Sequence, residues 1–165
     1  MTVDAVALNP RPWIDHYPPN IRWDIDVDLT PVHQRLMAVC ARTPDAVALD
    51  FLGATTTYGA LGKAVSAFAA ALQSDFGVGK GSRVALMLPN TPFYVVAYYG
   101  VLMAGGTVVN CNPLYTVTEL TYMVANSGAE IMVTLDLVQL FPKAEALAEA
   151  GHIKRLIVCN FPTAL

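Results

Sequence analysis

The sequence has few charged side chains for its length. Lys, Arg, Asp and Glu make up 14% of the 165 residues, and 55% are apolar, whereas globular domains typically hold about 25% charged and about 45–50% apolar residues. A domain of this size needs less apolar side chain than this for its own core. Two interpretations follow: the chain lies in a membrane, or it packs against further polypeptide, and we favour the second.

Clusters of positive charge are also lacking. The ten lysines and arginines are scattered along the chain, and the net charge is −3. Nucleic-acid binding needs a concentrated positive surface that displaces counterions. We therefore expect no nucleic-acid partner.

Cysteines are few, with Cys40, Cys111 and Cys159 widely spaced and odd in number. This pattern argues against a disulfide framework, and the apolar neighbours of each cysteine are typical of small buried side chains. The N-terminal residues lack a basic segment followed by a long apolar one, so we expect no signal peptide. A reducing, cytoplasmic location is the prediction.

One apolar stretch approaches the length of a membrane span. Residues 93–109 are 17 uncharged residues, and about 20 are needed to cross a bilayer. However, Pro92 opens this stretch, and Gly100, Gly105 and Gly106 interrupt it. No flanking Lys or Arg marks a cytoplasmic side. A buried helix followed by a buried strand is therefore favoured.

The order of elements predicts an α/β fold. No charged side chain occurs between Arg83 and Glu119, and this stretch has the order strand, helix, strand, which is typical of parallel sheets. We expect strands at 83–87, 107–110, 130–134 and 155–159, with helices between them and a hairpin at 46–58. Right-handed crossovers should cover both faces of a mostly parallel sheet.

Threonines mark the expected helix starts. Thr30 and Thr91 each precede a proline, a pattern typical of a hydroxyl N-cap followed by proline at the first helical position. Thr116 and Glu119 have the spacing of a capping box. Thr57 or Tyr58 leads into a further helix.

Motifs for phosphate or metal are missing. In the glycine-rich segment 77–82, Ser74 stands where a P-loop needs its first glycine, and Gly81 follows Lys80 where Ser or Thr is required. A helix precedes this segment and a strand follows it, the reverse of the order that places phosphate at a helix N-terminus. We expect a simple turn here. The histidines lack metal-ligand spacing: His16, His33 and His152.

Two loops are candidates for ligand contact. Ligands of open α/β sheets gather at the carboxyl ends of strands, and the loops at 88–90 and 110–113 follow two expected strands. The alternative, which we favour, is that their asparagines only satisfy loop backbone groups: Asn90, Asn110 and Asn112.

Several segments together resemble one enzyme family. Residues 57–61, TYGAL, are similar to the first core motif of the adenylate-forming (AMP-binding) acyl-CoA synthetases, and residues 102–110, LMAGGTVVN, are similar to the second. Segments 79–90 and 112–120 match the family's first sheet strand and the region after the second motif. The arm at 13–18, WIDHYP, resembles the opening of bacterial long-chain fatty-acid–CoA ligases.

The resemblance implies the N-terminal portion of an acid–thiol ligase of lipid metabolism. Such enzymes use ATP and Mg²⁺ to convert a fatty acid to an acyl-adenylate, and CoA then displaces AMP. The family's phosphate loop, adenine-contacting segment, ribose-binding aspartate and C-terminal lysine are not found in residues 1–165. We therefore nominate no catalytic, cofactor-binding or metal residue, and expect no cofactor to bind this segment alone.

The expected organisation is an irregular proline-rich arm at 1–28 and an incomplete α/β subdomain at 29–165. Its expected partner is the remainder of the ligase chain, and the resemblance also suggests a homodimer and peripheral contact with membranes. The alternative is a stand-alone, non-catalytic binding or oligomerisation module derived from the family. The acyl chain length, and CoA ligation as opposed to adenylation alone, stay open.

Overall fold

The computed structural model describes residues 11–161, which fall into two units divided between Thr30 and Pro31. In the first unit, the described residues form one short 3-10 helix, η1 (Ile14–His16), and irregular chain. The Thr30 hydroxyl donates to the Asp28 carboxylate at 2.6 Å, and the Thr30 backbone N–H donates to the same oxygen at 2.8 Å. Thr30 is therefore part of a local turn.

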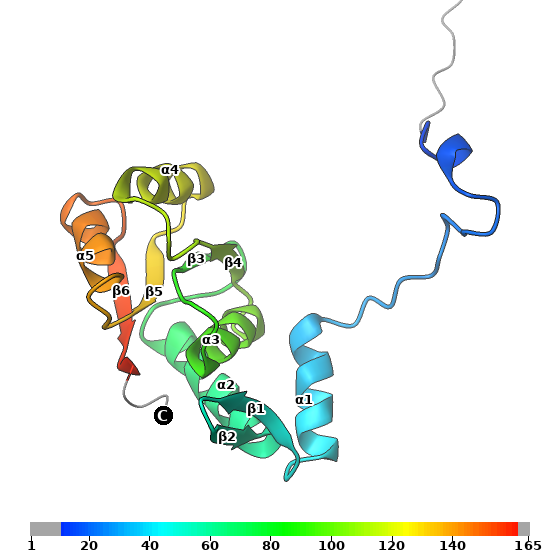
Figure 1. The fold of residues 1–165 in the computed structure, drawn as a ribbon, viewed down its shortest axis with the longest axis horizontal. Coiled ribbons are helices and arrows are strands. Elements are labelled where there is room, and N and C mark those ends of the chain that lie inside the picture. The colour runs from blue at the N-terminus through cyan, green and yellow to red at the C-terminus, as the bar shows by residue number, and fades with distance from the viewer. Residues whose placement is uncertain (1–10, 162–165) are drawn as a thin grey trace, which may run out of the picture. The chain divides into compact units, whose positions relative to one another are not determined.

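The second unit holds the α/β fold (Figure 1). Its helices are α1 (Val32–Arg42), α2 (Tyr58–Ser74), α3 (Pro92–Met103), α4 (Val117–Ser127) and α5 (Phe141–Glu149). Its strands are β1 (Val47–Phe51), β2 (Ala54–Thr57), β3 (Arg83–Leu86), β4 (Thr107–Asn110), β5 (Ile131–Leu135) and β6 (Arg155–Cys159).

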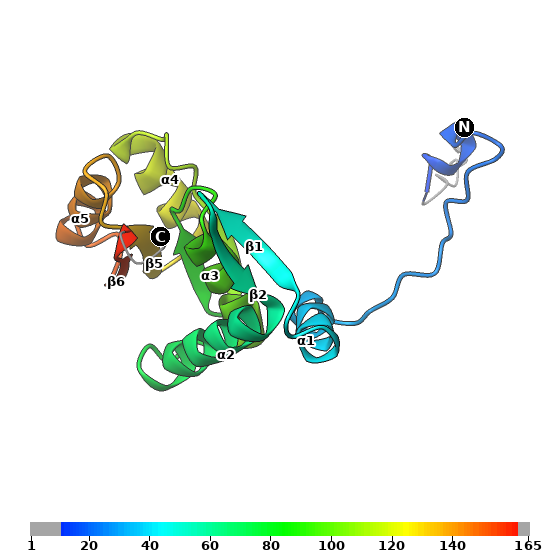
Figure 2. The ribbon, with the colours of Figure 1, turned by 60° about the horizontal axis from the view of Figure 1, so that its bottom comes forward.

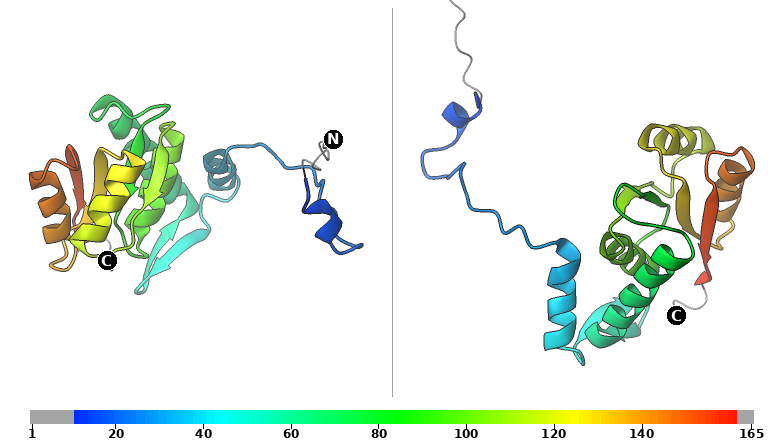
Figure 3. Two further views of the ribbon diagram at one scale, coloured as in Figure 1. Left: turned by 90° about the horizontal axis from the view of Figure 1, so that it is seen from above. Right: turned by 180° about the vertical axis from the view of Figure 1, so that it is seen from behind.

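Four parallel strands form the main sheet in the order β4-β3-β5-β6, and β1 and β2 form an antiparallel hairpin. Helices α2 and α3 lie on one face of the sheet, and α4 and α5 lie on the other (Figures 1 and 3). The predicted α/β class, parallel strands and hairpin are confirmed.

The central and edge strands differ in burial. Every residue of β5 is buried, as are Val84, Ala85 and Leu86 of β3, which is typical of parallel strands covered on both faces. The edge strand β4 is only half-buried, with Thr107 and Asn110 exposed. The expectation that 107–110 is a buried strand is therefore wrong, because this strand has a neighbour on one side only.

The helix starts agree with the sequence in part. The Thr57 hydroxyl accepts from the Ala60 N–H at 3.2 Å, and Thr116 and Glu119 form the predicted capping box. Thr30 is not an N-cap, because α1 begins at Val32 and Pro31 occupies the cap position. No helix within residues 11–161 has the length and apolar character of a membrane span.

Gly100 sets the approach of α3 to α2. A Cβ at this position would lie 2.6 Å from Cδ1 of the Phe68 ring on α2. Real Cβ atoms do not come this close, so the helix spacing depends on the missing side chain.

We predict that Gly100→Ala lowers the free energy of unfolding by about 1–3 kcal/mol through overpacking, although alanine favours helix by about 1 kcal/mol. Urea unfolding of the purified chain measures this change. The same substitution in a Phe68→Leu background should cost less, because the shorter side chain lacks the ring atoms. Equal costs in both backgrounds would contradict the packing explanation.

Candidate functional site

The sheet reverses its order of strands at β3. The chain passes from β3 to β4 on one side and then crosses back to β5 on the other, and ligands of open α/β sheets bind at the carboxyl ends of strands at such a reversal. Past the end of β3, the Met87 N–H donates to the Val133 carbonyl at 2.9 Å, and the buried Thr134 hydroxyl donates to the Met87 carbonyl at 3.2 Å. These bonds fix the point where the loop 88–91 leaves the sheet.

A groove of about 370 Å³, here called the carboxyl-edge groove, opens beside this loop between β1 and the start of α3. Figure 2 shows the hairpin lying beside α3. The groove is lined by Ala48, Leu49, Asp50, Phe51, Asn90, Thr91, Pro92, Tyr94 and Val95. Its walls are mostly apolar, and the described lining contains no Lys or Arg. The Asp50 carboxylate accepts from the Gly53 N–H at 3.2 Å and thus serves the hairpin turn.

Thr91 carries an unsatisfied hydroxyl in this groove lining. Its side chain is buried, with 6% of the residue exposed, and Oγ1 has no hydrogen-bond partner among the described residues. Thr91 is the N-cap residue of α3, yet it makes no side-chain cap bond. Buried polar atoms are almost always paired, so this hydroxyl marks the place where the fold leaves a polar group for something else to satisfy.

The second predicted loop is held from two sides. The Asn112 side chain accepts from the Leu114 N–H at 3.0 Å, which confirms the favoured backbone role for this residue. Asn110 differs, because its side chain accepts from the Tyr94 hydroxyl at 3.0 Å and joins the loop to α3. Lys143 of α5 donates to the carbonyls at 113 and 115, at 2.9 and 2.8 Å. Asn90 alone of the three asparagines lines the groove.

Two thiols lie at the same carboxyl edge. Cys111 follows β4, Cys159 ends β6, and both are free. Burial raises the pKa of Cys111 from the usual 9.0 to about 11. Burial, together with the negative charge of Asp136, raises the pKa of Cys159 to about 11 as well. Both thiols keep their protons at neutral pH and are therefore poor nucleophiles.

The carboxyl-edge groove could not be predicted from the sequence, because one of its walls comes from the hairpin, about forty residues before Asn90. No sequence pattern indicated that β1 lies beside α3. Within residues 11–161, no group of three His, Cys, Asp or Glu side chains is placed to hold a metal ion.

Comparison with known proteins gives a consistent result. Residues 36–162 match the family described as AMP-binding enzyme. The chain is 38% identical over 150 residues to a long-chain-fatty-acid–CoA ligase of Bacillus subtilis, and 40% identical over 143 residues to one of Yersinia pestis. These alignments cover 91% and 86% of this chain but 26% and 25% of the relatives. The chain therefore spans about a quarter of the length of these curated relatives.

Solved structures share the fold. A benzoate CoA ligase from Burkholderia xenovorans superposes with a TM-score of 0.70 at 30% identity, covering 82% of this chain and 27% of that one. A long-chain-fatty-acid–CoA ligase from Archaeoglobus fulgidus gives 0.71 at 21% identity, over 82% and 28% of the two chains. The latter likeness supports the fold alone.

We predict that Thr91→Val raises the free energy of unfolding by about 1 kcal/mol, because it removes an unpaired buried hydroxyl at nearly constant shape. Thr57→Val is the matched control: it removes a threonine N-cap that does accept a backbone N–H, and should cost about 1 kcal/mol. Urea unfolding measures both. A loss of stability in Thr91→Val would show that the hydroxyl has a partner in the free chain.

Alkaline pH should destabilise the fold through the two thiols at the carboxyl edge. Their pKa values are raised to about 11 in the folded chain, so the unfolded chain loses these protons first. Their stabilising contribution is complete below about pH 8.5 and is lost as the pH rises toward 11. The expected loss is on the order of 1 kcal/mol per thiol near pH 10.

Denaturation from pH 7 to 11 measures this loss. The Cys111→Ala/Cys159→Ala variant should show a shallower fall in stability over the same range, and parallel curves would reject this source of pH dependence.

Proposed function

This chain belongs to the family of AMP-binding enzymes, and from that premise we propose that it is the N-terminal segment of a fatty-acid–CoA ligase that is inactive without further polypeptide. The identity of 38% to a long-chain-fatty-acid–CoA ligase, over nine-tenths of this chain and a quarter of the relative, carries the proposal. The complete enzyme would activate a fatty acid with ATP and transfer the acyl group to CoA.

The surface of the second unit supports a role as part of a larger protein. Both edge strands of the main sheet, β4 and β6, are only half-buried. In the described part of the chain no strand pairs with their outer edges, so the N–H and C=O groups there need either water or another strand. Apolar side chains also remain exposed at Leu114 and Val158, with 86% and 41% of their surface accessible. Further chain of the same protein would cover such surfaces.

The carboxyl-edge groove does not fit ATP by itself. Adenylate formation develops negative charge on the departing pyrophosphate and needs cations around it. The described residues that line the groove offer Asp50, Asn90 and Thr91 as polar groups, and none is positively charged. Lys143 of α5 does not line the groove and is engaged with two carbonyls of the loop after β4. The groups that hold ATP, Mg²⁺ and CoA would therefore come from the remainder of the ligase.

The role of this chain would then be to form one wall of a site that the remainder of the ligase completes. The bonds from Met87 and Thr134 fix the loop 88–91, and the bonds from Lys143 fix the loop at 113–115. Both loops come after strands of the main sheet and are positioned before any ligand arrives, which reduces the ordering cost of binding. A cytoplasmic location, contact with membrane surfaces and pairing of two copies are supported by the resemblance alone.

We predict that the 165-residue chain catalyses no ATP–pyrophosphate exchange with long-chain fatty acids. A chimera in which this chain replaces the aligned quarter of the Bacillus subtilis ligase should form acyl-CoA. The chimera tests the fold and the site together, because the replaced segment must pack against the rest of the enzyme. Acyl-CoA is measured by thiol consumption and by mass.

Two controls make this result decisive. The unmodified Bacillus subtilis ligase sets full activity, and the same ligase without the aligned quarter sets the background. A folded chimera with background activity only would contradict the proposal and favour a stand-alone binding or oligomerisation module. ATP–pyrophosphate exchange catalysed by the 165-residue chain alone would contradict the prediction that this chain is inactive.

A further inference from the structure

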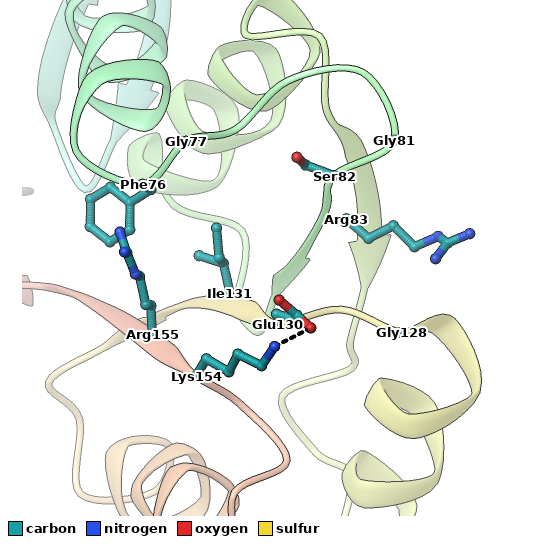
Figure 4. A pocket seen from close by; sticks show the side chains of 10 residues that line it. All are labelled: Phe76, Gly77, Gly81, Ser82, Arg83, Gly128, Glu130, Ile131, Lys154 and Arg155. Carbon is teal, nitrogen blue, oxygen red and sulfur yellow. Dashed lines mark hydrogen bonds and ion pairs between the residues drawn. The ribbon is translucent and has the colours of Figure 1, made fainter.

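A second cavity, of about 460 Å³, lies at the opposite edge of the main sheet. We call it the amino-edge cavity, because Arg83, Ile131 and Arg155 line it and are the first residues of β3, β5 and β6 (Figure 4). The glycine-rich loop 77–82 forms its other wall (Figure 4). It is separate from the carboxyl-edge groove, since the sheet's strands run from one to the other.

Three cations and one carboxylate surround the amino-edge cavity: Arg83, Lys154, Arg155 and Glu130. The Arg155 guanidinium donates to the Asp75 carbonyl at 2.5 Å and lies 5.6 Å from the centre of the Phe76 ring. These two contacts hold Arg155 in place and leave further N–H groups for a ligand, because a guanidinium has five. Lys154 pairs with the Glu130 carboxylate at 2.5 Å (Figure 4).

Arg83 stands at the rim. Its Nη1 lies 3.2 Å from the position that a Cβ on Gly128 would take, and Figure 4 shows its guanidinium turned away from the Lys154–Glu130 pair. It adds positive charge to the cavity without contacting that pair. The lining thus has two more positive than negative side chains.

The glycine-rich loop adds uncharged donors. The Gly79 N–H donates to the Ser82 hydroxyl oxygen at 3.1 Å, and the Ser82 N–H donates back to the Gly79 carbonyl at 3.0 Å. Among the described residues, none accepts a hydrogen bond from the N–H group of Lys80 or Gly81. Gly81 adopts φ +93°, a backbone conformation that residues with side chains rarely adopt. Turns of this kind with free N–H groups attract anions.

We propose that the amino-edge cavity binds a small phosphate-class anion. Arg155 supplies a guanidinium held by two contacts, Lys154 an exposed ammonium, and the loop supplies the Ser82 hydroxyl and the Gly81 N–H. The anion competes with Glu130 for Lys154, so Glu130 weakens binding and makes the site selective for ligands of more than one negative charge. The sequence of the loop alone did not predict this site, because Lys154 and Arg155 come more than seventy positions later.

The test is titration of the ¹⁵N-labelled 165-residue chain with inorganic pyrophosphate, followed by two-dimensional NMR. We expect saturable shifts concentrated at the backbone N–H groups of 79–83 and 154–155, which weaken as salt is raised. Vesicles containing phosphatidic acid form a second arm, which distinguishes a lipid headgroup from a free anion as the source of the phosphate. Shifts spread over the surface, or none at these residues with either probe, would overturn the proposal.

Two substitutions should act in opposite directions. Glu130→Gln frees Lys154 and should tighten pyrophosphate binding about threefold, whereas Lys154→Gln should weaken it about fivefold, as expected for one charge-assisted hydrogen bond. Lys63→Gln, which removes an exposed lysine from α2, is the matched control and should leave binding unchanged. If Lys63→Gln and Lys154→Gln weakened binding equally, pyrophosphate would be held by general charge attraction only, and the proposed site would be rejected.

Arg155→Gln should weaken binding at least as much as Lys154→Gln. This substitution also removes the bond to the Asp75 carbonyl. If the Arg155→Gln variant unfolds, the Glu130→Gln and Lys154→Gln variants decide the question alone, because those two side chains contribute to stability only through an exposed ion pair.

Discussion

The pairing of β3 with β4 on one side and β5 on the other is the constraint on which the structure depends. A buried strand must satisfy its N–H and C=O groups within the protein, and β3 does so by contacting both neighbours. The chain reaches these neighbours in opposite directions, which creates the reversal of strand order. The carboxyl-edge groove and the amino-edge cavity both lie at ends of this central strand, so one pairing pattern positions both.

The same pairing pattern explains why the outer strands of the main sheet are less buried than the central ones. Strands β3 and β5 pair on both sides, whereas within residues 11–161 no strand pairs with the outer side of β4 or β6. The low charge content of the sequence agrees with this arrangement. Large apolar side chains are exposed on the described second unit, among them Leu52, Leu114 and Tyr122.

Much of the fold could be predicted from local patterns, because the signals are local. The capping box at Thr116 and Glu119 and the strands at 107–110 and 155–159 appear where the sequence places them. Thr30 and Thr91 share the same Thr-Pro pattern, yet neither hydroxyl caps a helix. The first is engaged by Asp28, and the second is buried against its surroundings. Tertiary contacts of this kind, like the convergence of Arg83 and Arg155, have no local signature.

The distribution of charge between the two edges follows from the polarity of the fold. Helices α3, α4 and α5 begin at the carboxyl edge and present their positive ends there, and helices end at the amino edge, where cations are favourable. Arg155 bonds the carbonyl of Asp75, just beyond α2, and Arg83 lies against Gly128, just beyond α4. These two arginines therefore stabilise helix ends. Lys154 does not, since it pairs with Glu130, and the free N–H groups of the glycine-rich loop serve no helix. Helix polarity accounts for part of the positive charge at this edge. The donors that an anion would use are Lys154, the loop N–H groups and the N–H groups of Arg155 that do not bond the Asp75 carbonyl.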